Sequence, residues 1–208
     1  LQQSIMNFGI LMVQGRVNSF GTAVMAAFAA AVKIDSFAYM PVQDFGNAFS
    51  TFIAQNYGAG KQKRISQGIK SAVLAAFAFC LIISAAVCVF AAPLMGIFVK
   101  ASETEIISIG VGYLRIEGAF YFGIGLLFLL YGYYRAVKMP GMSVVLTILS
   151  LGTRVVLAYT LSAIPAVGVT GIWVSVPIGW ALADLVGVVY YWRKVRNLYY
   201  GENCKKQV

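Results

Sequence analysis

Polar side chains recur at helical spacing inside the long apolar stretches of this sequence. Four amides share one face of the first stretch: Gln3, Asn7, Gln14 and Asn18. Four further polar side chains share one face of the second: Asp44, Asn47, Thr51 and Gln55. At 100° per residue, the first set spans about 60° and the second about 80° of a helix surface. Such full-length stripes favour a shared water-filled cleft that binds a substrate or an ion, with hydrogen bonding inside a solid bundle as the alternative.

Six ionisable residues also fall inside the apolar stretches, where a charge is expensive and is a functional candidate by default. They are Arg16, Asp44, Arg115, Glu117, Arg154 and Asp184. Glu117 and Arg154 fall at similar depths, which predicts a structural ion pair between them. Asp44 has no partner at its depth and lies on the polar face, so its carboxylate is a candidate to hold a proton, a Na⁺ or a cationic substrate. Glu117 is a second candidate for that negative charge.

The residue types that most catalytic and metal sites need are missing or badly spaced. The chain has no histidine, so a histidine general base and a histidine metal ligand are both excluded. Cys80 and Cys88 would lie about 12 Å apart on one helix, too far for a disulfide, and Cys204 stands alone near the end. We therefore expect no catalytic residue and no metal site, and we predict that the protein is not an enzyme.

Six long apolar runs must position the polar groups. Hydrophobic residues make up 60% and charged residues 11% of the 208 residues, against about 25% charged in a soluble domain. A run of about 20 apolar residues is long enough to cross a bilayer as a helix. The runs fall near residues 3–20, 36–57, 70–98, 106–134, 142–162 and 168–191. The sequence thus predicts an all-α membrane protein, with a six-helix transmembrane lobe over 1–192 and a basic cytoplasmic tail over 193–208.

The net charge of +9 is distributed unevenly between the connections. Basic residues follow the second, fourth and sixth runs, whereas the other connections are near neutral, the first of them carrying Lys33 with Asp35. Because cytoplasmic loops are enriched in Lys and Arg, both ends of the chain are expected in the cytoplasm, and no nucleic-acid partner is needed to explain the charge. Tyr133, Tyr134 and Trp173 are expected at the membrane interfaces.

Several segments of the sequence carry recognisable motifs. They are Gln2-Gln3-Ser4, Asn18-Ser19-Phe20-Gly21, Met40-Pro41, Phe52-Ile53-Ala54-Gln55-Asn56-Tyr57-Gly58-Ala59-Gly60-Lys61, Tyr113-Leu114-Arg115-Ile116, Tyr134-Arg135-Ala136, Pro140-Gly141-Met142 and Gly168-Val169-Thr170-Gly171-Ile172-Trp173. In order and spacing they resemble the second half of a multidrug and toxic compound extrusion (MATE) transporter, over about residues 1–200. The resemblance implies twelve spans in two six-helix lobes, related by an axis along the membrane normal, of which this chain supplies the second.

The resemblance also implies a secondary active antiporter that exports organic, often cationic, compounds in exchange for H⁺ or Na⁺ across a bacterial plasma membrane. It implies no cofactor beyond that coupling ion. The implied partners are membrane lipid, small organic substrates and an N-terminal six-helix lobe, on the same or a separate chain.

The chain departs from two patterns within the MATE family. In NorM-like members the second lobe carries two acids, and their positions fall near Met6 and Ile124 here, both apolar, so coupling of that type is not supported in this lobe. In DinF-like members the coupling acid lies in the first lobe. Asp44 is therefore nominated on physical grounds alone.

Two other functions stay open. A flippase for lipid-linked saccharides shares the architecture, but it should have a strongly cationic cleft for pyrophosphate, whereas the two stripes here are neutral apart from Asp44. An accessory or truncated membrane subunit without transport activity of its own would also fit a single lobe. Dye efflux from vesicles that hold only this chain separates such a subunit from an exporter.

Overall fold

The computed structural model describes the backbone of residues 2–195 and the side chains of Ser4 and of residues 8–193. Within that part of the chain every regular element is a helix, as the sequence predicted. The α-helices are α1 (Gln2–Asn18), α2 (Thr22–Gly58), α3 (Gln62–Val89), α4 (Ala91–Phe98), α5 (Thr104–Gly118), α6 (Tyr121–Ala136), α7 (Pro140–Leu161) and α8 (Thr170–Tyr190), and a π-helical turn η1 (Tyr191–Val195) follows. The tail over 193–208 lies almost entirely outside the described residues.

The second helix is much longer than the apolar run expected to begin at residue 36. α2 runs for 37 residues from Thr22. Lys33 and Asp35, which were expected in an outer connection, therefore lie within the helix. The physical reason is the alanine-rich segment 22–34, since alanine has the highest intrinsic helix propensity and the segment contains no Gly or Pro that would stop a helix.

Two of the expected spans are interrupted. The run over 70–98 is divided into α3 and α4, because Pro93 has no N–H with which to bond the carbonyl of Val89, where α3 ends. The run over 106–134 is divided at residues 119–120 into α5 and α6, which meet at an angle of 53°. This bend lets α5 and α6 contact α2 along different parts of its length.

The described helices are those of a multi-pass membrane protein. Within residues 2–195, α2, α3, α7 and α8 with its extension to Arg193 are each long and apolar enough to cross a membrane, and the bent pair α5–α6 forms a fifth such unit. The shorter α1 has 17 residues. At 1.5 Å per residue it is about 26 Å long, close to the hydrocarbon thickness of about 30 Å.

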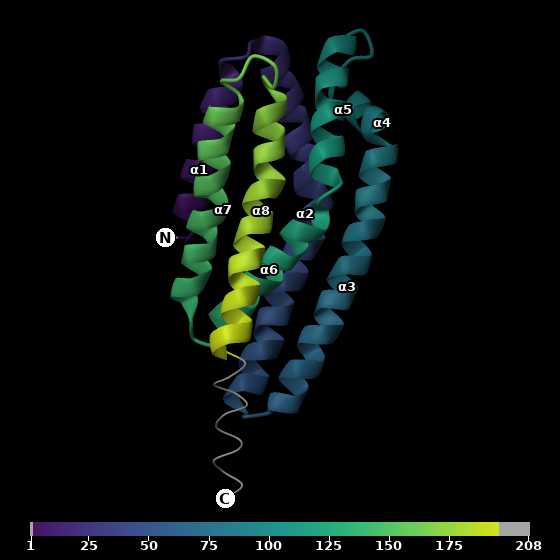
Figure 1. Cartoon of the computed structure of the whole chain (residues 1–208). Helices are drawn as coiled ribbons and strands as arrows, with labels where there is room; N and C mark the ends of the chain where they lie inside the picture. Colours follow the sequence, from purple (N-terminus) through teal and green to yellow (C-terminus); the bar gives the residue numbers. More distant parts are fainter. Residues whose placement is uncertain (1, 196–208) are drawn as a thin grey trace, which may run out of the picture.

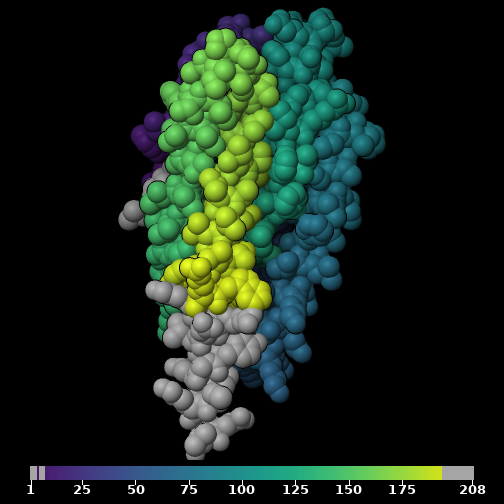
Figure 2. All heavy atoms as spheres, in the orientation of Figure 1, coloured from purple at the N-terminus to yellow at the C-terminus, as the bar shows by residue number. Residues whose placement is uncertain are grey.

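The helices form one elongated bundle with α6 at its centre (Figure 1). α7 and α8 run side by side in opposite directions, and α1 lies against α7. The space-filling view shows the atoms of α7 and α8 in contact along the bundle (Figure 2). On the other side, α2 packs against α3, α5 and α6. Twelve of the 16 residues of α6 are buried, because this helix joins the two halves of the bundle.

α2 and α6 approach each other so closely that only glycine fits between them. A Cβ atom at Gly132 would lie 2.6 Å from the Gly46 carbonyl oxygen, and one at Gly46 would lie 3.1 Å from the Phe128 carbonyl oxygen. Small residues allow helix backbones to come together in this way inside membranes. The contact fixes where α6 crosses α2, and therefore which residues at the start of α6 face α2.

We predict that Gly132→Ala destabilises the bundle, because the added methyl group would push the α2 backbone away. Overpacking of this kind costs about 1–3 kcal/mol, measured as a lower midpoint of thermal unfolding in detergent. Gly152→Ala is the matched control, since this exposed glycine of α7 has no atom within 4 Å of an added Cβ. The control should be neutral or slightly stabilising. Equal effects of the two substitutions would contradict the close contact.

Candidate ion and substrate site

Two carboxyl groups face each other in the interior of the bundle. Asp35 of α2 is 2% exposed, and Glu117, next to the last residue of α5, is 4% exposed. The two carboxyl groups are near enough to influence each other. A hydrogen bond between two carboxyl groups needs a proton on one of them, because an ionised carboxylate only accepts hydrogen bonds. The arrangement can therefore hold a proton or, in its place, a small cation.

Three further side chains surround the two acids. The Tyr121 hydroxyl, at the start of α6, donates a hydrogen bond to Asp35 Oδ1. Tyr113, one turn before Glu117, interacts with both acids. The guanidinium of Arg154, on α7, interacts electrostatically with both carboxyl groups. These five residues form what we call the carboxyl cluster.

Not every polar atom of the carboxyl cluster has a partner. Asp35 Oδ2, Glu117 Oε1 and Arg154 Nε are buried and make no hydrogen bond within the described part of the chain. One arginine charge offsets one carboxylate, so a second carboxylate would be uncompensated in an interior closed to water. The two unpartnered oxygens are the positions at which a proton or a cation such as Na⁺ can be held.

The bend between α5 and α6 brings these side chains together. Glu117 and Tyr121 stand on either side of the bend, where the Phe120 N–H donates to the Glu117 carbonyl at 2.9 Å. The Ser84 hydroxyl of α3 donates to the carbonyl of Gly118, the last residue of α5. The serine thus provides a partner for a carbonyl at a helix end, where intrahelical partners are lost.

Tyr113 of the carboxyl cluster packs against two further aromatic rings, Phe28 and Trp173. Phe28 of α2 stacks on Trp173 of α8, with ring centroids 5.5 Å apart and planes inclined by 8°. Tyr113 meets Trp173 edge-on, with centroids 4.9 Å apart. Trp173 is 2% exposed, so its ring packs inside the lobe, and its expected place at a membrane interface stays a prediction. Tyr133 and Tyr134 are buried as well.

Glu117 shares the charge of Arg154 with a second acid. The two charges interact, but Glu117 Oε1 and Arg154 Nε each lack a hydrogen-bond partner among the described residues. Asp35 shares the same arginine, so two acids stand against one cation. A direct Glu117–Arg154 ion pair therefore stays a prediction.

Asp35 is the member of the carboxyl cluster that the sequence analysis missed. Its neighbour Lys33 made the segment resemble a charged connection between two spans. A signal was nevertheless present, because Asp35 follows Ala27 and Ala31 at intervals of four residues, and all three are buried. Extending the helix back to Thr22 would have placed Asp35 on the buried face.

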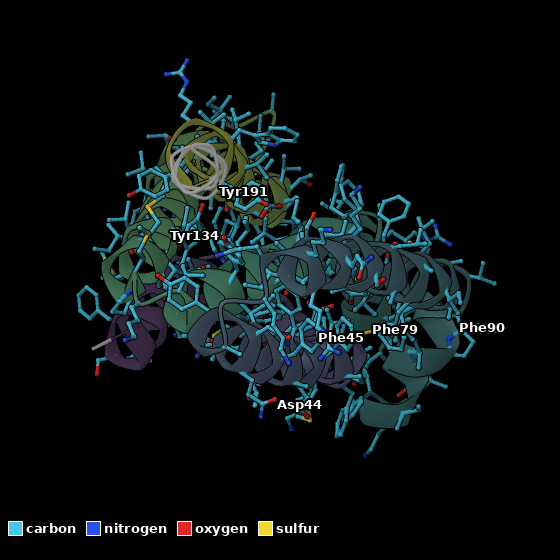
Figure 3. All side chains as sticks on the ribbon, turned by 90° about the horizontal axis from the view of Figure 1, so that it is seen from below. Asp44, Phe45, Phe79, Phe90, Tyr134 and Tyr191 are labelled. Atoms are coloured by element: carbon cyan, nitrogen blue, oxygen red, sulfur yellow. The ribbon has the colours of Figure 1, made fainter. Side chains whose placement is uncertain are left out.

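The four polar residues expected on one face of α2 point outward from the bundle. The four residues Asp44, Asn47, Thr51 and Gln55 are all exposed, and we call them the polar stripe. Figure 3 shows Asp44 pointing away from the other helices. Arg135, at the end of α6, donates from Nη2 to Asn47 Oδ1 at 3.2 Å. The polar stripe and the carboxyl cluster are thus separate surfaces of the same lobe.

The amides expected on the first helix are only partly described. Asn18 is exposed and Gln14 is half-buried. Gln3 and Asn7 belong to α1, but their side chains lie outside the described residues. Their expected place in a cleft stays a prediction.

A third buried acid lies away from the carboxyl cluster. Asp184 of α8 is buried, and its Oδ1 makes no hydrogen bond in the described structure. It lies against α6, since a Cβ atom at Gly123 would be 3.7 Å from Asp184 Oδ2. Asp184 is therefore a useful reference for the effect of removing a buried carboxyl group in general.

We predict that Tyr121→Phe destabilises the lobe, because the substitution removes the hydroxyl donor from buried Asp35. An unsatisfied buried acceptor costs about 1–3 kcal/mol, which thermal unfolding in detergent would detect. Tyr159→Phe is the control, since the Tyr159 hydroxyl donates to the Met12 carbonyl at 3.3 Å on the exposed surface. If the two variants lose the same stability, the Tyr121 hydroxyl has no special role beside Asp35.

Comparisons with known proteins agree on one family. The MatE family model matches residues 1–160. The probable multidrug resistance protein YpnP of Bacillus subtilis (strain 168) is 28% identical over 193 residues, which are 92% of this chain and 42% of the relative. The probable multidrug resistance protein YoeA of the same strain is 26% identical over 185 residues, 86% of this chain and 39% of the relative. This chain thus spans about two fifths of the length of these relatives.

Solved transporter structures share the fold. A MOP superfamily transporter from Pyrococcus furiosus superposes with a TM-score of 0.88 at 21% identity, over 95% of this chain and 44% of that one. The Vibrio cholerae MATE transporter VcmN superposes with a TM-score of 0.86 at 24% identity, over 96% of this chain and 45% of that one. In both, the matched part is a little under half of the neighbour. With a family model that covers most of its length, the chain belongs to the MatE family of membrane transporters.

Proposed function

We propose that this chain is the C-terminal lobe of a secondary active transporter that exports organic, often cationic, compounds in exchange for H⁺ or Na⁺. The observation that carries the proposal is the carboxyl cluster, in which two buried acids interact with the half-buried Arg154 inside a membrane lobe. Ionisable residues in such places mark ion and proton pathways. The names of the Bacillus subtilis relatives, which describe probable multidrug resistance proteins, support the substrate class. An N-terminal six-helix lobe would complete the transporter.

The carboxyl cluster is the proposed coupling site. When Asp35 and Glu117 share a proton or hold Na⁺, Arg154 balances the remaining negative charge and the helices can close around the site. Loss of that ion leaves two carboxylates against one guanidinium, which is unfavourable unless water enters. Movement of α2 away from α5 and α6 would let the acids be hydrated. Ion occupancy would thus shift the population between a closed and an open lobe.

The polar stripe is the proposed substrate-facing surface. A row of exposed amide, hydroxyl and carboxylate groups cannot face lipid without a large cost, so it is expected to face the first lobe across a water-filled cleft. The Asp44 carboxylate would attract a cationic substrate, and the uncharged groups would bind its polar atoms. Gln14 and Asn18, with Gln3 and Asn7 as expected from the sequence, would extend this surface along α1.

Asp44→Asn is expected to reduce efflux of a cationic dye by about tenfold, since a loss of about 1.4 kcal/mol of attraction weakens binding tenfold. The measurement is dye efflux from proteoliposomes that hold this lobe with its partner lobe. Glu103→Gln, which removes an exposed acid just before α5, is the matched control and should leave efflux unchanged. Normal efflux by a well-folded Asp44→Asn protein would remove Asp44 from substrate binding.

Glu117→Gln is expected to abolish transport driven by an imposed H⁺ or Na⁺ gradient while substrate exchange without a gradient continues. The reason is that an amide can neither release a proton nor bind a cation as a carboxylate does. Both activities can be measured in the same proteoliposomes. Asp184→Asn removes another buried acid outside the carboxyl cluster and should keep gradient-driven transport. Full gradient-driven transport by Glu117→Gln would exclude the carboxyl cluster as the coupling site.

A further inference from the structure

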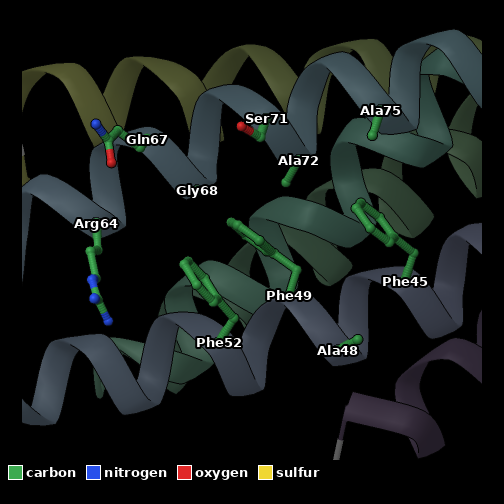
Figure 4. Close-up of a pocket in the computed structure, with 10 residues that line it drawn as sticks. All are labelled: Phe45, Ala48, Phe49, Phe52, Arg64, Gln67, Gly68, Ser71, Ala72 and Ala75. Atoms are coloured by element: carbon green, nitrogen blue, oxygen red, sulfur yellow. The ribbon is translucent and has the colours of Figure 1, made fainter.

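A long apolar groove runs between α2 and α3 and is open along the surface of the lobe (Figure 4). Its larger part has a volume of about 710 Å³ and is lined on the α2 side by Phe45, Phe49 and Phe52. A second part of about 290 Å³ continues past Phe45 toward Pro41 and Phe79. Figure 3 shows Phe45 and Phe79 near each other in this region. The two parts form one extended apolar surface.

Small residues on α3 make room for the groove. Gly68, Ala72 and Ala75 line it opposite the phenylalanines. A Cβ atom at Gly68 would collide with the Phe52 ring, so this ring lies directly against the α3 backbone. The groove therefore results from large side chains on one helix facing small ones on the other.

One end of the groove is cationic. Arg64 lines it there, and Figure 4 shows the Arg64 side chain beyond Phe52 at the end of the row of rings. The segment 58–70 also contains Lys61, Lys63 and Lys70, and it contains no acid. The groove thus combines a long apolar interior with positive charge at one end.

The outer surface of α3 is apolar. Leu74 is 71% exposed and Ile82 is 68% exposed, which is the pattern of a helix that faces lipid. The groove is distinct from the polar stripe, because Phe45 lies about 100° around α2 from Asp44. It therefore lies where α2 adjoins the lipid-facing helix α3.

We propose that the groove between α2 and α3 binds one acyl chain of an anionic phospholipid, whose phosphate group is held by Arg64. Charge complementarity selects this occupant, because basic pockets between membrane helices bind anionic lipid headgroups. The length is suitable as well. Arg64 and Phe79 are about 22 Å apart along α3, and one leaflet of the hydrocarbon core is about 15 Å thick. The inference does not depend on the transport proposal, since neither the carboxyl cluster nor the polar stripe lines the groove.

Native mass spectrometry of the delipidated protein can test this site. The probes are phosphatidylglycerol and phosphatidylcholine with identical acyl chains. The unsubstituted protein should retain phosphatidylglycerol in preference, and Arg64→Ala should weaken that binding about fivefold, the effect expected of one basic residue near a lipid surface. Lys63→Ala is the matched control. It removes the same charge at the neighbouring position, and the Lys63 side chain does not line the groove. It should bind phosphatidylglycerol nearly as the unsubstituted protein does.

Ser71→Trp provides a second variant, which fills the groove from an exposed position on α3. It should lose binding of both lipids, and an unchanged elution volume and unfolding midpoint would confirm that it is folded. Equal losses in Arg64→Ala and Lys63→Ala would overturn the proposed phosphate contact. Lipid binding that survives Ser71→Trp would overturn the groove as the acyl-chain site. Loss of bound lipid on assembly with the first lobe would also overturn the proposal, because the groove would then be a contact between lobes.

Discussion

The lobe is organised around the need to keep two acids in its interior. A carboxylate away from water is costly unless donors and an opposite charge surround it. The Tyr121 hydroxyl donates to Asp35, and Tyr113 and Arg154 interact with both Asp35 and Glu117. The acids come from α2 and α5, and their partners come from α5, α6 and α7, so one electrostatic requirement links helices from both halves of the bundle. The contact of Tyr113 with Trp173 adds α8 to this set of helices.

Two features of the backbone make this arrangement possible. In a straight helix, Glu117 and Tyr121 would stand one above the other on the same face. The 53° bend between α5 and α6 changes the direction of the chain between them, so that the tyrosine can reach Asp35 from a different side. The contact between Gly46 and Gly132 then holds α6 against α2, about three turns beyond Tyr121. Uncharged residues thus position the charged ones: Gly46 and Gly132 at the contact between α2 and α6, and Ser84 at the end of α5.

The sequence predicted that the chain is a set of membrane helices, but it did not predict how those helices bend and which side chains they bring together. Long apolar runs have few stable arrangements other than helices in a bilayer, and the polar stripe has a helical period that is visible locally. Asp35 is different, because its hydrogen-bond partner Tyr121 lies 86 residues away and its helix begins in an alanine-rich segment that resembled a connection. The bend at residues 119–120 has no proline to signal it, and only Gly118 marks its start. Contacts between residues so far apart in the sequence can be identified only once the fold is known.

α2 contributes residues to the carboxyl cluster, the polar stripe and the groove. Asp35 and Asp44 are nine residues apart, which places them about 13 Å apart along α2 and on opposite faces. Pro41 lies between them and cannot donate the backbone hydrogen bond that would stiffen the helix at this point. A change of angle at Pro41 would therefore move the polar stripe and the phenylalanine side of the groove relative to the carboxyl cluster. Under the transport proposal, gain or loss of an ion between Asp35 and Glu117 would bias that angle, and α2 would carry the change from the buried site to the substrate-facing surface.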